Sequence, residues 1–353
     1  MSLTVRSPSG QEEVGRQEKA IYAAFGSPKV GDDLDNAGFR EMIPDDHRLL
    51  VEDNTSDPAR ILAGLLWFDG AMSMPGGARV PVSMLSGVGV MPGDQGRGAL
   101  RLMMTEYLRR ARDVGAAASV LMASSMKLYG RYGYGVSTQC ADWEIASSAS
   151  ELVAQAPLSG SIETIHERDD AVGRQLDAVW ERAADARAGS LRRAPRWWRG
   201  VLATKETWLG GGEQLLALHR DETGDVDGYV LYKVKTDDSG GHHVSTITIV
   251  ELVGVDAAAE LALFAHIATF PWTRRITWAY APLDPPALSW LADPRALERR
   301  ANYDFLWLRL LDLPEMARQR TFGAAGRVRL DVRDEVFPDL GGRWDLVAEG
   351  GRG

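Results

Sequence analysis

The 353-residue sequence contains a single cysteine, Cys140. One cysteine cannot form an intrachain disulfide, and one chain cannot build a thiolate metal cluster from it, so the fold must be held by packing. Its neighbours Gln139 and Ala141 offer no base that would activate the thiol, so Cys140 is interpreted as a buried structural residue. The six histidines include no H-E-x-x-H motif and no i, i+4 pair, and no metal is expected.

Long apolar runs and an excess of basic charge are also missing. The longest apolar runs, such as residues 61–68, are far shorter than the roughly 20 residues of a membrane helix, and no basic-then-apolar leader opens the chain. Lysine plus arginine number 40 against 49 acidic residues, a net charge of -9. This sign does not suit a protein that neutralises nucleic-acid phosphates. We therefore expect a cytoplasmic protein that binds neither membrane nor nucleic acid.

The remaining composition is that of a folded globular protein with two or three domains. Apolar residues make up 45% and charged residues 25%, and the length exceeds that of one typical domain. Residues 147–161, rich in serine, alanine and glycine, mark a domain boundary. A third segment begins near Asn302 and has about half the length of a typical domain of roughly 100 residues, so it is expected to be incomplete.

Hydrophobic periodicity predicts an α/β (α+β) fold. Residues 80–90 alternate as a strand does, a glycine-rich turn follows, and apolar residues then recur at helical spacing from Leu100 until Gly115 stops the helix. A short strand at 119–123, a turn or short helix through Tyr129 and a strand at 134–145 complete this unit. A second α/β segment weakly repeats this order, with helices at 171–184 and 257–269 and strands at 227–234 and 244–252.

One stretch holds most of the negative charge. The segment between Gly31 and Asp57 contains nine acidic residues and only two basic ones. Such a run is usually a solvated surface. The alternative is that it forms one wall of a cleft for cationic substrates.

The glycine-rich turn, residues 88–100, is suited to a phosphate. A turn that opens a helix directly after a strand presents free backbone N–H groups and the positive end of the helix dipole, and Arg97 can add a charged contact. The dinucleotide pattern G-x-G-x-x-G does not fit, because the glycines are spaced too widely and Pro92 intervenes. The ATP-type P-loop does not fit either, because Ala99 and Leu100 stand where lysine and serine or threonine are needed.

The turn does match the Gln/Arg-x-x-Gly-x-Gly/Ala motif of the GNAT acetyltransferase superfamily, read as Gln95-Gly96-Arg97-Gly98-Ala99-Leu100. Its last position departs, because Leu100 replaces glycine or alanine. Together with residues 123–135 (ASSMKLYGRYGYG), the turn resembles the Eis (enhanced intracellular survival) family, whose members also carry leucine there. The likeness continues in Trp197-Trp198, Asp227-Gly228-Tyr229, Asp293-Pro294-Arg295 and Leu306-Trp307-Leu308-Arg309-Leu310, and it spans about residues 20–345.

The resemblance implies three parts and an activity. These are a catalytic GNAT domain (1–150), a second GNAT-like domain without a cofactor motif (151–299) and a partial sterol-carrier-protein-like domain (300–353). Family members transfer acetyl from acetyl-CoA to primary amines, many of them on aminoglycosides, and the family suggests a homo-oligomer, often a hexamer. In the second segment, the turn Val253-Gly254-Val255-Asp256-Ala257 has no second glycine motif, which agrees with a structural role or a wall for substrate.

The resemblance also assigns residues to roles. Val88 and Val90 offer backbone groups to the pantetheine arm, and the turn Gln95, Gly96, Arg97, Gly98, Ala99 and Leu100 binds the diphosphate. Tyr129 matches the general acid that protonates the departing thiolate, and Ser124 matches the neighbouring site serine. Apart from the resemblance, Tyr132, Tyr134 and Trp67 are interpreted as core residues, and the alternative for Trp67 is that a cationic sugar stacks on it or on Phe25 beside the acidic stretch.

The general base stays unassigned. The family uses a carboxylate at its very C-terminus, whereas this sequence stops at Gly350-Gly351-Arg352-Gly353, short of the family's usual end. Either the last half of the third domain is absent, or another group serves, with Asp32, Asp33 or a water-linked carboxylate as candidates. Three functions stay open: acetylation of a polycationic small molecule such as an aminoglycoside, acetylation of a protein lysine or a biosynthetic amine, and non-catalytic acyl-CoA binding or assembly.

Overall fold

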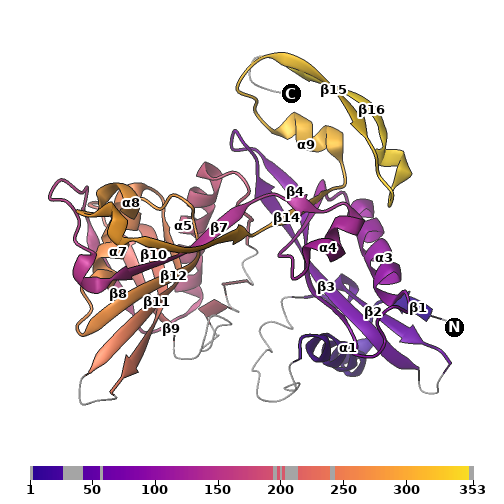
Figure 1. The fold of residues 1–353 in the computed structure, drawn as a ribbon, viewed down its shortest axis with the longest axis horizontal. Helices are drawn as coiled ribbons and strands as arrows, with labels where there is room; N and C mark the ends of the chain where they lie inside the picture. The colour runs from indigo at the N-terminus through magenta and orange to yellow at the C-terminus, as the bar shows by residue number, and fades with distance from the viewer. Residues whose placement is uncertain are drawn as a thin grey trace. The chain divides into compact units, whose positions relative to one another are not determined.

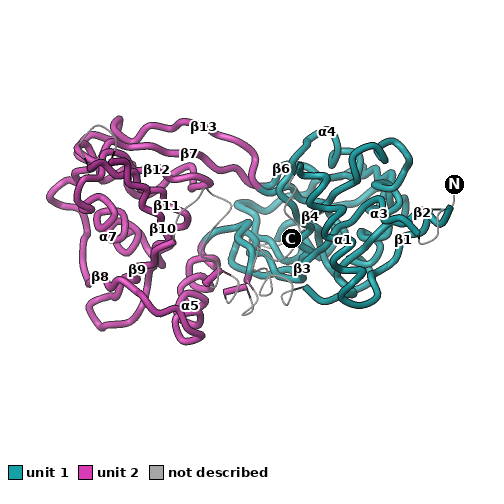
Figure 2. Tube along the Cα trace, turned by 90° about the horizontal axis from the view of Figure 1, so that it is seen from below, with its two compact units in different colours: residues 1–137, 187–192, 306–353 teal, residues 138–186, 193–305 magenta. Residues whose placement is uncertain are grey.

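The structure is a computed structural model that describes residues 3–26, 43–55, 59–193, 197–198, 201–202, 214–238 and 243–349. Contacts divide the chain into two compact units (Figure 2). Unit 1 contains residues 1–137, 187–192 and 306–353, and unit 2 contains residues 138–186 and 193–305. The units are spatial clusters, and the sequence limits of the three expected domains stay a prediction.

Unit 1 is built on a seven-stranded sheet in the order β1-β2-β3-β4-β5-β14-β6 (Figure 1). Its strands are β1 (Leu3–Arg6), β2 (Arg48–Asp53), β3 (Arg60–Ser73), β4 (Arg79–Val90), β5 (Ala118–Leu121), β14 (Trp307–Leu310) and β6 (Gly135–Val136). Helix α3 (Ala99–Asp113) covers one face of the sheet, where it packs in one core cluster with Leu49, Val51 and Trp67 of the strands. Helix α1 (Gly10–Ala24) covers the other face, where Ala20 packs on Leu50 and Ile61.

Helix α3 confirms the predicted periodicity. Met103, Met104, Tyr107 and Leu108 are fully buried on its inner face. The helix is followed by Gly115, whose φ of 83° lies in the left-handed region that favours glycine. The predicted strands at 80–90 and 119–123 are also present, as β4 and β5.

The strand predicted at 134–145 is wrong as a single element. It is two strands in different sheets, because β6 pairs with β14 in unit 1, whereas β7 (Gln139–Ala146) pairs with β12 and β13 in unit 2. The chain leaves unit 1 between Ser137 and Thr138. Both strands are apolar enough to look continuous in sequence, and only the pairing reveals the break.

Unit 2 holds a second seven-stranded sheet in the order β13-β7-β12-β11-β10-β9-β8. Its other strands are β8 (Ser161–Ile165), β9 (Gln214–Arg220), β10 (Val226–Asp237), β11 (Val244–Gly254), β12 (Thr273–Ala281) and β13 (Glu298–Asp304). Helix α7 (Ala257–Ala268) packs on the face that carries Ala217 and Val230. Helix α5 (Asp170–Ala186) packs on the opposite face, against Leu218 and Leu231. The predicted second α/β segment is therefore confirmed.

The C-terminal part of unit 1 adds a short helix and a hairpin. Helix α9 (Leu313–Gln319) is capped by Asp312, whose carboxylate accepts a hydrogen bond from the Glu315 N–H at 2.9 Å. Strands β15 (Gly326–Val332) and β16 (Gly342–Ala348) pair only with each other (Figure 1). The loop between them is tied to the main sheet by the buried ion pair of Arg309 with Asp334.

Candidate active site

The turn between β4 and α3 is open toward its surroundings. Gly93, Gly96 and Gly98 have φ values of 88°, 80° and 89°, and an added Cβ at any of them would meet no atom within 4 Å. Gly98 is the N-cap of α3, and as a glycine it has no side chain that could cap the amide groups of this helix end. The first turn of this described helix also contains no acidic residue. The amide N–H groups and the positive end of the helix dipole are therefore available to an anion.

A network of four charged residues connects the turn to strands β2 and β3. The Arg97 guanidinium pairs with Asp94 at 2.8 Å and with Asp53 at the end of β2. Arg60, at the start of β3, donates two hydrogen bonds to Asp94, at 2.6 and 2.8 Å. The Asp53 and Asp94 carboxylates are almost fully buried. Thr55 and Arg97 lower the pKa of Asp53, and Arg60 and Arg97 lower that of Asp94. Sequence reasoning singled out Arg97 but not the other three members of the network, because Asp53 and Arg60 are distant from it in sequence and Asp94 belongs to no motif.

Strand β4 opens away from its parallel neighbour at the height of the turn. It pairs with β5 only over Val82–Met84, whereas its pairing with β3 continues to Val90. A bulge places Gly87 and Val88 opposite one residue of β3, and Gly87 has a φ of 60°. Beyond Met84, the second edge of β4 has no strand partner in the described part of the chain. Its backbone groups there can receive an extended ligand as an added strand.

Tyr129 and Ser124 lie in the segment that follows β5. Helix α4 (Met126–Tyr129) ends at Tyr129, whose side chain is 4% exposed. Val88, Val90 and Leu100 are half-buried and pack with Tyr129 around the same cluster of side chains, so the structure brings together the residues predicted from two motifs. Burial raises the pKa of the Tyr129 hydroxyl, and its hydrogen bond with Ser124 opposes that shift. Tyr129 therefore stays protonated at neutral pH.

Four further hydroxyl groups, which sequence reasoning did not single out as a site, form a buried cluster between the sheet and α3. The Ser119 hydroxyl lies 2.6 Å from both the Tyr107 and the Tyr134 hydroxyl. The Tyr107 hydroxyl also lies 2.9 Å from that of Ser83. Tyr134 is buried, as predicted. Only strand register brings Ser83 beside Ser119, so no sequence motif signals the cluster.

Comparisons with known proteins agree with this geometry. Two profiles, both of acetyltransferase (GNAT) domains, match residues 8–137 and 189–310. The N-acetyltransferase Eis of Mycobacterium tuberculosis is 30% identical over 360 residues, which cover 100% of this chain and 84% of the relative. The chain belongs to the Eis-like family of GNAT N-acetyltransferases. An uncharacterised N-acetyltransferase of Streptomyces griseus is 32% identical over 369 residues, covering 99% of this chain and 84% of the relative.

Solved structures show the same fold. Eis1 from Mycobacterium abscessus superposes on this Eis-like chain with a TM-score of 0.81 at 25% identity, covering 98% of this chain and 83% of that one. A GCN5-related N-acetyltransferase from Anabaena variabilis gives a TM-score of 0.82 at 19% identity, over 99% and 84% of the two chains. The protein is therefore an N-acetyltransferase with two GNAT domains, and acetyltransferases of this superfamily use acetyl-CoA as their acetyl donor.

The residues predicted to contact the substrate of this Eis-like enzyme differ in their exposure to solvent. Phe25 is 59% exposed at the end of α1. The Trp67 indole is buried, packs against Tyr107 and is stacked on His47, with ring centroids 5.2 Å apart. Asp32 and Asp33 lie outside the described residues. Asp69, next to His47, adds an exposed carboxylate on β3.

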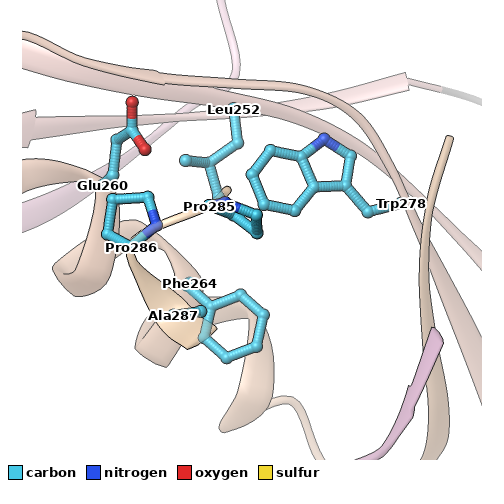
Figure 3. Close-up of a pocket in the computed structure, with 7 residues that line it drawn as sticks. All are labelled: Leu252, Glu260, Phe264, Trp278, Pro285, Pro286 and Ala287. Carbon is cyan, nitrogen blue, oxygen red and sulfur yellow. The ribbon is translucent and has the colours of Figure 1, made fainter. Parts of the chain in front are cut away.

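Unit 2 of the Eis-like chain repeats the strand–helix–strand order but differs at the helix N-terminus. Strand β11 pairs in parallel with β12 from Ser245 to Ile249 and then continues to Gly254. The carboxylate of Asp256, the N-cap of α7, accepts a hydrogen bond from the Ala259 N–H at 3.0 Å. Where the two strands part, side chains leave a cavity of about 10 Å³ (Figure 3). It is lined by Leu252, Glu260, Phe264, Trp278, Pro285, Pro286 and Ala287.

Two negative observations concern only the part of the chain that the structure describes. Within it, no three His, Cys, Asp or Glu residues gather as metal ligands. No helix there has the length and apolar character needed to cross a membrane.

Cys140 is buried, as predicted, and burial raises the pKa of its thiol to about 11.

Proposed function

We propose that unit 1 binds acetyl-CoA and transfers its acetyl group to primary amines of a polycationic small molecule, with an aminoglycoside as the expected type. The observation that carries this proposal is the N-terminus of α3, where the N-cap is a glycine, the first turn has no acidic residue, and the space beside the turn glycines is open. The residues fit the coenzyme, because the turn offers amide N–H groups to two phosphates and the free edge of β4 adjoins it.

Each part of the site has a role in this proposal. The backbone of Gln95, Gly96, Arg97, Gly98, Ala99 and Leu100 holds the diphosphate, and Val88 and Val90 align the pantetheine arm. The Arg97 side chain, already paired with Asp53 and Asp94, fixes the turn. The coenzyme supplies an acetyl group activated as a thioester. The substrate nitrogen forms a bond to the acetyl carbon while the carbon–sulfur bond breaks.

Tyr129 donates its hydroxyl proton to the departing sulfur in this mechanism, and Ser124 orients that hydroxyl. The amine attacks as the neutral nitrogen, the proton it still carries after the bond forms is released to water, and Tyr129 regains a proton from water. The burial that keeps Tyr129 protonated supports its role as the acid. A positioned acid contributes about 10²–10⁴-fold. The alignment of amine and thioester contributes more, because oriented reactants have effective molarities of up to about 10⁸ M.

The proposed charge of the substrate rests on exposed acidic residues of unit 1. Asp45 and Asp46 are exposed in the turn before β2, and Asp69 is exposed on β3. Phe25 offers an exposed ring for a sugar, and Trp67 supports this wall through His47. Asp32 and Asp33 belong to the same acidic stretch of the sequence.

Further properties follow from the family resemblance. We propose that the second GNAT domain lacks a cofactor site, that residues 300–353 are part of a sterol-carrier-protein-like domain, and that the protein is a cytoplasmic homo-oligomer, with a hexamer as the expected form. The Asp256 cap at α7 supports the first of these, because its carboxylate occupies the amide groups that an anion would need.

The test is a panel of aminoglycosides and lysine-containing peptides assayed by thiol release with acetyl-CoA. We expect kcat/KM for at least one aminoglycoside to exceed that for every peptide by about tenfold or more, and Gly98→Asp to lower all of these values. The carboxylate of that variant adds negative charge where the diphosphate binds. A preference for peptides would overturn the substrate class, and wild-type values for Gly98→Asp would overturn the coenzyme site.

A further inference from the structure

The hydroxyl cluster of Ser83, Tyr107, Ser119 and Tyr134 stands in an apolar core. Ser83, Tyr107 and Ser119 are 0% exposed and Tyr134 is 4% exposed. Burying a hydroxyl without a hydrogen bond costs about 1–3 kcal/mol, so these groups depend on one another. Ser119 is the central member. Because it has one proton, at least one of its two phenol partners must donate to it.

The cluster joins four elements where the sheet opens. Ser83 of β4 and Ser119 of β5 are a directly paired rung of the parallel ladder, and the next rung, Met84 with Val120, is the last. Tyr107 reaches them from α3, which begins at the coenzyme turn. Tyr134 reaches them from the segment after α4. The hydrogen bonds therefore fix the end of the strand ladder relative to α3, which follows the glycine-rich turn, and relative to the segment that follows Tyr129.

Tyr134 also contacts the proposed acid directly. Its N–H donates a hydrogen bond of 3.4 Å to the carbonyl of Tyr129. The two rings meet edge to face, with centroids 6.0 Å apart and an interplanar angle of 72°. A shift of the Tyr134 ring would therefore move the ring and the backbone of Tyr129 together.

The chemistry of the cluster favours orientation over proton transfer. Burial raises the pKa of both Tyr107 and Tyr134, so the two phenols stay neutral. The hydrogen bond of Tyr129 runs to Ser124, outside the cluster. Tyr129 is connected to Tyr134 by ring packing and by one backbone hydrogen bond.

We propose that Tyr134 and Ser119 are positioning residues for acetyl transfer, which hold Tyr129 at the angle needed to protonate the departing sulfur. The inference rests on the proposed role of Tyr129 as the acid. Tyr134 acts through its ring and backbone contacts with Tyr129, and Ser119 acts through the Tyr134 hydroxyl. Tyr107 and Ser83 complete the hydrogen bonds of Ser119.

The experiment measures steady-state kinetics with acetyl-CoA and one accepted amine for Tyr134→Phe, Ser119→Ala and the double variant. We expect kcat to fall about tenfold or more in each single variant, since small misplacements of reacting groups are costly. We expect the KM for acetyl-CoA to stay within about twofold, because the coenzyme turn is unchanged. The double variant should lose no more than the larger single loss, since both changes break one coupled interaction.

Two control variants separate the possible results. Tyr229→Phe removes a fully buried phenol hydroxyl in unit 2, which donates to Glu251 at 2.8 Å, and it should lower the melting temperature without lowering kcat. Tyr129→Phe tests the acid itself. If Tyr129→Phe is impaired while Tyr134→Phe and Ser119→Ala keep wild-type kcat, the positioning role is wrong and the proposed function stands. If Tyr129→Phe keeps wild-type kcat, the acid assignment fails, and the positioning role fails with it.

A purely structural role gives a different pattern. In that case Tyr134→Phe and Ser119→Ala would lower the melting temperature as Tyr229→Phe does and leave the kcat of the folded fraction unchanged. Tyr134→Phe keeps the aromatic ring but removes the hydroxyl that anchors it to Ser119, so this variant alone decides the question should Ser119→Ala fail to fold.

Discussion

At the scale of single residues, the environment of Tyr129 explains how an ordinary phenol can serve as an acid. Its side chain is almost fully buried, and its hydroxyl has Ser124 as hydrogen-bond partner. Burial raises the pKa of its hydroxyl, and the nearby Tyr132 phenol adds to this shift. A phenol in this setting stays protonated before the reaction, because deprotonation would place a charge in an apolar core.

Replacing Tyr129 by phenylalanine should lower kcat by about 10²–10⁴-fold, the usual contribution of a positioned acid. The wild-type enzyme should lose activity at alkaline pH as Tyr129 loses its proton, and because burial raises this pKa, that loss should begin above the ordinary range of a tyrosine. The variant should show no such alkaline limb. The measurement is the pH profile of kcat, with Tyr132→Phe, a buried neighbour in the same segment, as matched control. An unchanged alkaline limb in Tyr129→Phe would assign the titration to another group.

At the scale of elements, the glycine-rich turn between β4 and α3 is tied to two strands. Asp94 connects the turn to β3 through Arg60, and Arg97 connects it to β2 through Asp53. Two buried carboxylates close to a site for phosphates would repel the ligand if they were alone. The two arginines neutralise them, so the open amide groups of α3 determine the sign of the local field.

This network predicts a specific dependence of stability on pH. The pKa of Asp94 is lowered in the folded state, so its contribution is fully present above the unfolded value of about 3.9 and is lost as pH falls below it. Asp94→Asn should lower the free energy of unfolding at pH 7 by about 1 kcal/mol, a modest value because Arg60 is half exposed. As pH falls from the unfolded value through the lowered pKa of folded Asp94, the wild type should lose stability faster than the variant, and the two proteins should converge. Urea unfolding at each pH measures this.

The matched control is Asp113→Asn, which removes an exposed carboxylate paired with Arg109 on the same helix. This variant should follow the wild-type curve closely, since both members of the pair are exposed. Equal losses in Asp94→Asn and Asp113→Asn would show that the buried network adds nothing to the stability of the turn. The same urea series decides between the two results.

Much of the fold could be predicted from local pattern, and the rest needed partners distant in sequence. The helix of Leu100–Val114 and the strand of Val80–Val90 follow from periodicity, and the structure has both. The break at Ser137 and Thr138 could not be foreseen, because it depends on which sheet each half joins. The hydroxyl cluster escaped for the same reason, since serine and tyrosine carry no motif until strand register aligns them.

At the scale of the whole molecule, both units contain a helix that follows a strand where it parts from its parallel neighbour. The N-terminus of this helix is open to an anion in unit 1 and is capped by a carboxylate in unit 2. In unit 1, the helix after the parting strand is capped by Gly98, and its first turn has no acidic residue. In unit 2, the equivalent helix is capped by the Asp256 carboxylate and has Glu260 in its first turn. The space between the parting strands there is filled by Pro285, Pro286 and their neighbours (Figure 3).

The contrast predicts one coenzyme per chain. Isothermal titration of the purified protein with coenzyme A should give a stoichiometry of about one, and Gly98→Asp should weaken that site by about tenfold or more, since tenfold corresponds to about 1.4 kcal/mol and a helix terminus contributes up to about 2 kcal/mol. Asp256→Ala frees the α7 amide groups but leaves a cavity that holds about one water, so it should create no second site. Two equivalents bound by the wild type would show that unit 2 binds coenzyme as well, and one equivalent that Gly98→Asp leaves unchanged would show that the coenzyme does not bind at the α3 turn.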